Sequence, residues 1–126
     1  IVTIQKKLFS IGSLLALGDY KSVTKIDNKK LQIKKIDIDY IENEIDKIDK
    51  NLSTITKFTI PGGHILISYL HIARCVCRRA ERKISYLNGI EKLDPNIPAY
   101  INRLSDLLFI LSRYFCKKLN VKELYW

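Results

Sequence analysis

The sequence predicts an all-α protein built as an antiparallel bundle of helices. In four segments, apolar residues recur at alternating spacings of three and four, the period that lines one face of a helix. No segment alternates apolar and polar residues in the manner of a strand. Because 126 residues with 47% hydrophobic content are enough for one core, we expect residues 1–126 to form a single domain.

The first predicted helix covers the start of the chain and ends near Gly18. Its apolar face is formed by Ile4, Leu8, Ile11 and Leu15. The segment 17–35 that follows is polar, basic and without period, so we expect an exposed, mobile loop. The chain contains no methionine and opens on a helical pattern without a capping residue, so we expect that residues precede Ile1 in the native protein.

The second predicted helix begins in the stretch "IDIDYIENEIDKIDKNL". Asp37 or Asp39 can cap its N-terminus, and Glu42 follows Asp39 by three residues, as in a capping box. Its apolar stripe is formed by Ile38, Ile41, Ile45, Ile48 and Leu52.

The stretch "FTIPGGH" ends this helical pattern. Pro61 cannot continue a helix, and Gly62 and Gly63 permit unusual backbone angles. The plainest interpretation is a corner between two helices, with Phe58 packed as an apolar staple.

The third predicted helix carries most of the arginines. Its seam keeps a four-three spacing and is formed by Leu66, Leu70, Ala73, Cys77, Ala80, Ile84 and Leu87. Arg74, Arg78 and Arg82 follow one another at intervals of four beside this seam. Arginine supplies only six of the 22 basic residues, so this ladder of planar guanidinium groups suits a row of phosphate oxygens. A solvated charged face with Glu81 as a local partner is an equal alternative.

The last predicted helix is apolar nearly all round. One stripe is formed by Ile97, Ile101, Leu104, Leu108, Leu111 and Phe115, and a second by Leu107, Ile110 and Tyr114. The polar residues Asn102, Ser105, Asp106 and Arg113 are expected together on the remaining surface. This pattern is typical of a helix at the centre of a bundle or at a subunit interface.

Composition limits the class of partner. Three cysteines, an odd number, favour free thiols in a reducing cytoplasm over a disulfide framework. No apolar run approaches the roughly 20 residues of a membrane-spanning helix, so we expect no membrane insertion. The formal charge of +9 favours an anionic partner, which could be a nucleic acid, a membrane surface or a polyphosphate.

The remaining polar residues give weaker signals. Asn102 and Asp106 lie one turn apart and could hold a ligand, although pairing with helix neighbours such as Arg103 is the favoured interpretation. Residues two positions apart on a helix point about 200° apart, so Cys75 and Cys77 cannot chelate one metal.

Neither histidine suggests a metal centre. His64 and His71 lack a second ligand at helical spacing, and no Glu-x-x-His pair is present. We therefore assign no metal-ligating residue in the protein.

Three separated stretches carry a resemblance to a known family. "FTIPGG", "ARCVCRRAERK" and "INRLSDLLFILSRY" resemble the signature run of the trimeric ATP:cob(I)alamin adenosyltransferases of the propanediol-utilisation type, in the same order and spacing. "IQKKLFSIGSLLA" resembles the preceding family helix more loosely. The resemblance implies a ferritin-like helical bundle that assembles as a homotrimer. It also implies transfer of the 5′-deoxyadenosyl group of ATP to cob(I)alamin, which gives adenosylcobalamin and triphosphate.

The resemblance also implies roles for particular residues. The ATP-binding residues would be Arg78, Arg79, Glu81 and Arg82 of the arginine-rich helix and Asn102 of the last helix. Arg74 and Arg78 would be the catalytic residues, with Arg74 at the subunit interface. Phe58 would lie against the corrin of cobalamin, where its bulk would keep the lower base away from cobalt.

The implied ligands and partners follow from that reaction. Cobalamin and ATP would be the substrates, and Mg²⁺ would bridge triphosphate oxygens. Protein partners would be a cobalamin reductase and a cobalamin-dependent enzyme, with no role for nucleic acid or membranes. Family members also carry an N-terminal Thr-Gly-Asp-x-Gly loop that wraps ATP, and a helix whose acidic residue would pair with Arg74. Neither is found in this sequence, which begins after both.

Two other classes remain open. A basic helical module that binds nucleic acid would fit the charge of +9, but aromatic residues do not alternate with the basic ones along a surface stripe. A steep salt dependence of DNA or RNA binding would identify this class. A purely structural or assembly bundle would fit the apolar last helix.

Overall fold

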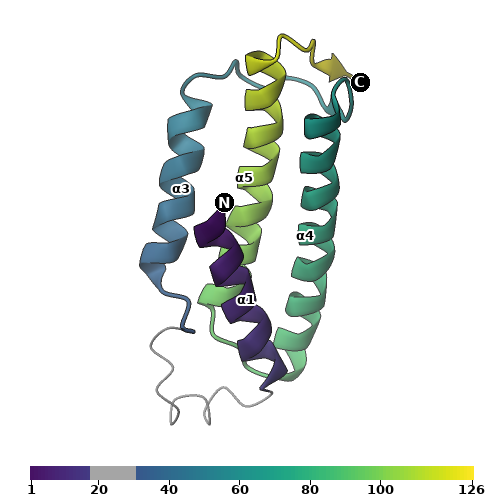
Figure 1. The fold of residues 1–126 in the computed structure, drawn as a ribbon. Coiled ribbons are helices and arrows are strands. Elements are labelled where there is room, and N and C mark those ends of the chain that lie inside the picture. The colour runs from purple at the N-terminus through teal and green to yellow at the C-terminus, as the bar shows by residue number, and fades with distance from the viewer. Residues whose placement is uncertain (18–30) are drawn as a thin grey trace.

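A computed structural model describes residues 1–17 and 31–126 of the chain. The helices and strands in these ranges are α1 (Val2–Ala16), α3 (Lys35–Asp49), β1 (Thr59–Ile60), α4 (Ile65–Ile90), α5 (Asn96–Lys118) and β2 (Leu124–Tyr125). Consecutive helices run in opposite directions, and α5 lies between α3 and α4 (Figure 1). The predicted antiparallel helical bundle is therefore confirmed. Most of the predicted loop 17–35 lies outside the described residues.

Helix α1 packs on the bundle through its C-terminal half. Ile11 and Leu14 are buried, and the helix ends at Ala16, close to the predicted end at Gly18. The predicted apolar face is only partly correct, because Leu8 is exposed. Ser10, which is outside the predicted face, is buried, and its hydroxyl donates a hydrogen bond to the Lys6 carbonyl oxygen at 3.1 Å.

The start of α3 differs from the prediction. Neither Asp37 nor Asp39 is the N-cap, because the extended residue Lys34 holds that position. The Asp37 Oδ2 atom accepts a hydrogen bond from the backbone N–H of Lys34 at 2.9 Å, which is the reciprocal half of a capping box. Asp39 instead forms an ion pair with Lys35 at 2.8 Å. The predicted stripe is correct: Ile38 and Ile41 are buried, and the other members are partly buried.

The C-terminal residues of the chain pack against the corner before α4. Gly62 and Gly63 have φ of 148° and 87°, so both use backbone angles that side chains disfavour. A Cβ atom at Gly63 would lie 2.6 Å from the Cγ1 atom of Val121, so glycine also permits this close approach. β1 pairs with β2 in an antiparallel register that places Thr59 opposite Tyr125. A pair of two-residue strands is too short to leave an alternating pattern, and the sequence did not predict it.

Phe58 is not the predicted apolar staple of this corner. Its side chain is 82% exposed. On α4 the predicted seam is mostly correct, since Cys77 and Ile84 are buried, but Ala80 is exposed and Ile67 is buried outside the seam.

Helix α5 is the central helix, as predicted. It holds ten of the buried residues, more than any other element among the described residues: Ile97, Tyr100, Ile101, Leu104, Ser105, Leu107, Ile110, Ser112, Arg113 and Cys116. The expected polar strip is only partly formed, because Ser105 and Arg113 are buried. They lie where neighbouring segments cover α5, so a helix surrounded on most sides leaves no continuous polar face.

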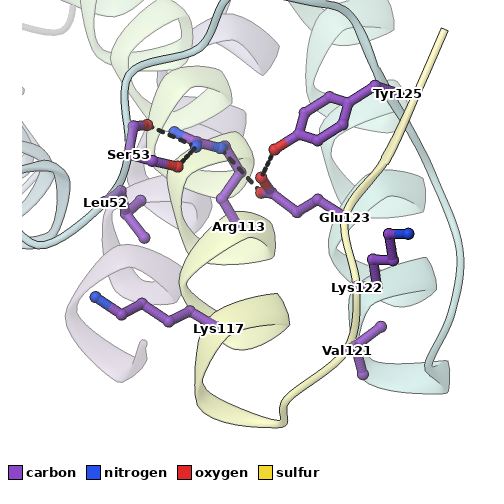
Figure 2. Close-up of a pocket in the computed structure, with 8 residues that line it drawn as sticks. All are labelled: Leu52, Ser53, Arg113, Lys117, Val121, Lys122, Glu123 and Tyr125. Carbon is purple, nitrogen blue, oxygen red and sulfur yellow. Dashed lines mark hydrogen bonds and ion pairs between the residues drawn. The ribbon is translucent and has the colours of Figure 1, made fainter.

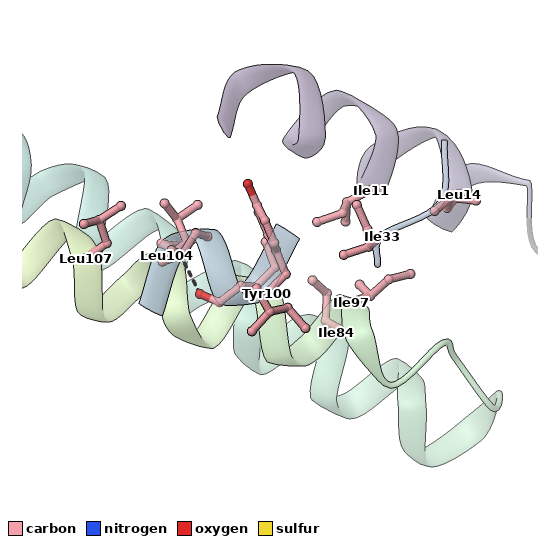
Figure 3. Packing of buried hydrophobic residues seen from close by; sticks show 12 residues of the cluster. Ile11, Leu14, Ile33, Ile84, Ile97, Tyr100, Leu104 and Leu107 are labelled. Carbon is pink, nitrogen blue, oxygen red and sulfur yellow. Dashed lines mark hydrogen bonds between the residues drawn. The ribbon is translucent and has the colours of Figure 1, made fainter. Parts of the chain in front are cut away.

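The core joins the first and last helices at one end of the bundle. Ile97 and Tyr100 of α5 lie close to Ile11 and Leu14 of α1, with Ile33 between them (Figure 3). Full burial of a side chain such as Ile33 stabilises the fold by about 1.5–3 kcal/mol. None of the described helices is long and apolar enough to cross a membrane.

Candidate functional site

The arginines of α4 separate into two environments. Arg78, Arg79 and Arg82 are exposed, whereas Arg74 is partly buried. Within the described part of the chain, Arg79 and Arg82 have no hydrogen bond or ion pair to another residue. The ladder therefore offers guanidinium groups to solvent on its C-terminal part and directs its first member toward α5.

Glu81 joins α4 to α5 at the centre of the predicted site. The Arg78 Nη1 atom lies 2.6 Å from Glu81 Oε2. The Asn102 Nδ2 atom donates to Glu81 Oε1 at 2.9 Å. The structure thus brings three predicted site residues into one hydrogen-bonded unit, and both carboxylate oxygens of Glu81 are engaged. The local Arg78–Glu81 pair also agrees with the alternative prediction of a solvated charged face.

Asp106, the other polar candidate on α5, pairs within its own helix. The Arg103 Nη1 atom donates to Asp106 Oδ2 at 3.0 Å, and Arg103 Nε lies 3.1 Å from Glu42 of α3. The favoured interpretation of Asp106 as a helix-pairing residue is therefore confirmed.

Arg74 lies over the face of an aromatic ring. Its guanidinium carbon is 4.7 Å from the centroid of the Phe109 ring, which is within the range of a cation–π contact. Its Nε atom is buried and has no hydrogen-bond partner. A buried donor without an acceptor destabilises the fold by about 1–3 kcal/mol, so Arg74 is in a position where an additional acceptor would be favourable.

A groove of about 380 Å³ runs along α4 beside these arginines. Its lining is formed by Pro61, Ser68, His71, Ile72, Cys75, Val76 and Arg79. The groove connects the corner that follows Phe58 with the arginine-bearing part of α4. Phe58 itself does not line it, and its carbonyl oxygen accepts a hydrogen bond from the Trp126 backbone N–H at 2.9 Å.

The two cysteines of α4 lie in different surroundings. The Cys77 Sγ atom is 3.4 Å from the Ile101 carbonyl oxygen, and burial raises the pKa of the Cys77 thiol to about 11. Cys75 is exposed. These positions confirm the interpretation of the two as a core thiol and a near-surface thiol.

His64 caps α4 through its side chain. Its Nδ1 atom accepts a hydrogen bond from the Leu66 N–H at 3.2 Å. Burial, and then the neighbouring Arg74, lower the pKa of His71. No group of three His, Cys, Asp or Glu side chains within residues 1–17 and 31–126 is arranged to hold a metal ion.

Sequence reasoning missed a second polar cluster, around Arg113. Arg113 is buried on α5 and forms an ion pair with Glu123 at 3.0 Å, and Tyr125 donates its hydroxyl to the same carboxylate (Figure 2). A cavity of about 320 Å³ adjoins the cluster, with Ser53 and Lys117 also in its lining. The available signal was an arginine in the strongly apolar second half of the last helix, which indicates a buried partner elsewhere in the chain.

The model of the "Cobalamin adenosyltransferase" family matches residues 1–115. The corrinoid adenosyltransferase of Mycobacterium leprae is 40% identical over 114 residues, which cover 87% of this chain and 59% of that protein. The corrinoid adenosyltransferase MMAB of Homo sapiens is 38% identical over 120 residues, which cover 95% of this chain and 48% of that protein. The chain therefore spans about half the length of these curated relatives.

Solved structures give the same relationship. A variant of the PduO-type ATP:corrinoid adenosyltransferase from Lactobacillus reuteri, complexed with cobalamin and ATP, superposes with a TM-score of 0.83 at 30% identity, covering 98% of this chain and 64% of that one. A second variant of that enzyme, complexed with ATP, superposes with a TM-score of 0.81. The family match over most of the chain, the relatives and the shared fold agree, and the chain belongs to the cobalamin adenosyltransferase family.

Proposed function

We propose that this protein transfers the 5′-deoxyadenosyl group of ATP to cob(I)alamin and releases triphosphate. The observation that carries the proposal is the unit of Arg78, Glu81 and Asn102 on an arginine-rich, exposed face of α4, in a chain of this family. A cationic face of this kind can stabilise the charge that develops on a polyphosphate leaving group.

Arg78, Arg79 and Arg82 bind the triphosphate in this proposal. Their guanidinium groups are exposed on α4 and can each donate paired hydrogen bonds to phosphate oxygens. Glu81 orients Arg78 through their ion pair, and Asn102 connects Glu81 to the buried helix α5. In this proposal both Glu81 and Asn102 also contact the nucleotide.

Arg74 and Phe58 complete the proposed site. Arg74, with its unpaired Nε atom, is assigned to the contact with a second subunit and acts with Arg78 in catalysis. Phe58 packs against the corrin and keeps the lower base away from cobalt, which makes cobalt easier to reduce to Co(I). The 82% exposure of Phe58 leaves its ring free for such a contact.

Mg²⁺ is assigned to the nucleotide and has no site of its own in this proposal. The described residues hold no cluster of three metal-ligating side chains. The exposed face of α4 presents arginine side chains, and its carboxylate, Glu81, is already bonded to Arg78 and Asn102. These residues fit phosphate oxygens, and the triphosphate oxygens would hold the metal, which neutralises charge there.

The proposed assembly is a homotrimer. α4 exposes apolar side chains at spacings of four and three, formed by Ile65, Tyr69, Ile72 and Val76. An exposed apolar stripe of this kind favours a protein contact, here with a second copy of the chain. Light scattering at micromolar concentration should give the mass of three chains, and a monomer would contradict the proposal.

Three further statements belong to the same proposal. Residues 1–126 form one domain, in support of which residues of all four described helices share one core. The protein works in the cytoplasm, where its three free cysteines would stay reduced. It receives reduced cobalamin from a reductase and supplies a cobalamin-dependent enzyme.

One experiment tests the activity directly. The full-length protein is mixed under strict anaerobiosis with ATP, Mg²⁺ and cob(I)alamin, while the cobalamin spectrum and free triphosphate are followed. We expect adenosylcobalamin and triphosphate in equal amounts. Cob(I)alamin that stays unchanged in the presence of folded protein would reject the proposed reaction.

A further inference from the structure

The Arg113 cluster connects three segments that are far apart in the sequence. Arg113 Nε donates to Glu123 Oε1 at 3.0 Å, and Arg113 Nη2 donates to the Ser53 carbonyl oxygen at 2.8 Å. Tyr125 donates its hydroxyl to Glu123 Oε2 at 2.5 Å. In Figure 2 the Arg113 side chain lies between Ser53 and Glu123, so α5 holds the segment after α3 on one side and the chain end on the other.

The chain end in turn contacts the Phe58 segment. β2 pairs with β1, so that Leu124 lies opposite Ile60, and the Trp126 N–H donates to the Phe58 carbonyl oxygen at 2.9 Å. Val121 lies close to Gly63. Residues 121–126, which we name the C-terminal strap, therefore lie along residues 58–63.

We propose that Arg113 and Glu123 are positioning residues, which hold the C-terminal strap in place and through it fix the backbone of Phe58. The consequence for catalysis rests on the proposed function, in which Phe58 contacts the corrin. Neither residue touches the substrates in this proposal; both act through the strap.

The strength of the two kinds of contact supports this assignment. An isolated pair of two-residue strands is marginal in water, so pairing of β1 with β2 cannot by itself hold the strap. Arg113 is 3% exposed, and its ion pair is screened little by solvent. The buried ion pair is therefore the stronger anchor, and the strand pair transmits its position to Phe58.

Hydrogen exchange tests this without any ligand. Glu123→Gln keeps the size and hydrogen-bonding ability of the side chain and removes its charge. We expect amides in residues 57–60 and 122–126 to exchange at least about tenfold faster than in the wild type, because one charge-assisted contact is lost. Lys122→Gln is the matched control, since Lys122 lies in the same strap, is exposed and has no partner among the described residues.

Unchanged exchange in folded Glu123→Gln, or equal acceleration in Lys122→Gln, would overturn the proposal. If Glu123→Gln does not fold, Tyr125→Phe replaces it. That variant removes a single hydroxyl from an exposed side chain, and we expect a smaller acceleration confined to the same amides.

Kinetics separate positioning from a general structural role. In Glu123→Gln we expect a roughly tenfold loss in adenosylation that starts from cob(II)alamin, with an unchanged KM for ATP. A tenfold rise in the KM for ATP would indicate a disturbed bundle and would reject the positioning role. Wild-type kinetics in a Glu123→Gln variant whose amides exchange faster would reject it as well. An inactive wild type would reject the proposed function alone, because hydrogen exchange still decides whether Arg113 and Glu123 hold the Phe58 segment.

Discussion

The molecule contains two arginine–glutamate pairs with similar geometry and different surroundings. Arg113 and Glu123 are 3.0 Å apart, with side chains 3% and 15% exposed. Arg78 and Glu81 are 2.6 Å apart, with side chains 46% and 20% exposed. The shorter pair is the more exposed one, so distance alone does not show which pair the fold depends on.

Burial decides what each pair can do. A buried ion pair is costly to break, because removing one partner leaves the other charged and poorly solvated. An exposed pair contributes only about 0–1 kcal/mol, so its arginine can exchange partners at little cost. The first pair is therefore suited to hold segments together and the second to bind an incoming anion.

The largest expected effect comes from breaking the buried pair. Glu123→Ala should lower the free energy of unfolding by about 3 kcal/mol, within the range for uncoupled buried charges. Urea denaturation measures this value, with Lys122→Ala as the control expected to change stability little. A loss of less than about 1 kcal/mol would mean that Arg113 is as well solvated as a surface arginine.

Replacing Arg78 by lysine tests the exposed pair through activity. Lys keeps the charge and loses the planar fork, so Arg78→Lys should reduce ATP-dependent adenosylation about ten- to a hundredfold, equivalent to 1.5–3 kcal/mol. The melting temperature should hardly change. Arg103→Lys is the matched control, because Arg103 also pairs with an acidic residue three positions later and is 45% exposed.

Two results would contradict this expectation. Equal activity in Arg78→Lys and Arg103→Lys would make Arg78 an ordinary surface charge. Equal losses of activity and melting temperature in Arg78→Lys would mean that Arg78 holds the bundle together.

Phe58 connects the buried pair to the substrate in these proposals, because the C-terminal strap fixes the Phe58 backbone and the Phe58 ring contacts the corrin. Phe58→Ala should leave the melting temperature unchanged, because the side chain is 82% exposed. Adenosylation that starts from cob(II)alamin should slow by roughly tenfold or more, or about 1.4 kcal/mol of barrier. Stopped-flow spectra of folded variants measure this step, and wild-type rates would leave Phe58 without a role in the reaction.

The smallest expected effect is a pH dependence near the buried pair. His71 and Arg113 line one small cavity, and burial and Arg74 lower the pKa of His71 in the folded protein. As the pH falls, His71 is therefore protonated in the unfolded chain before it is protonated in the folded protein. This contribution to the free energy of unfolding is complete above about pH 6.5 and decreases as the pH drops below that value. Urea titrations between about pH 7.5 and 5.5 should show a shallower fall in His71→Gln. Identical pH profiles would contradict the lowered pKa of His71.

The helices and the arginine cluster could be predicted because their signals are local. Apolar periodicity gave α3, α4 and α5, and the one-turn spacing of Arg74, Arg78 and Arg82 identified the cationic face. The contact of Glu81 with Asn102 joins two helices. Spacing could not supply it, and only the family resemblance placed these two residues together.

The remainder depends on segments that are distant in the sequence. Arg113 looks like part of a polar strip until Ser53 and Glu123 cover it, and neither carries a local sign of that contact. The pairing of β1 with β2 is set by the same long-range approach. Asp37 was misplaced for a different reason, since α3 begins at Lys35 and so moves Asp37 from the capping position into the first turn.

The different burial of the three cysteines offers a practical route to observing the α4 groove. The thiolate is the reactive form of cysteine, and burial raises the pKa of both Cys77 and Cys116. Cys75 alone is exposed, and it lines the groove together with Arg79. A maleimide fluorophore added at neutral pH would therefore attach at one position without any mutagenesis, and slower attachment in the assembled protein would report that a second copy of the chain covers the groove.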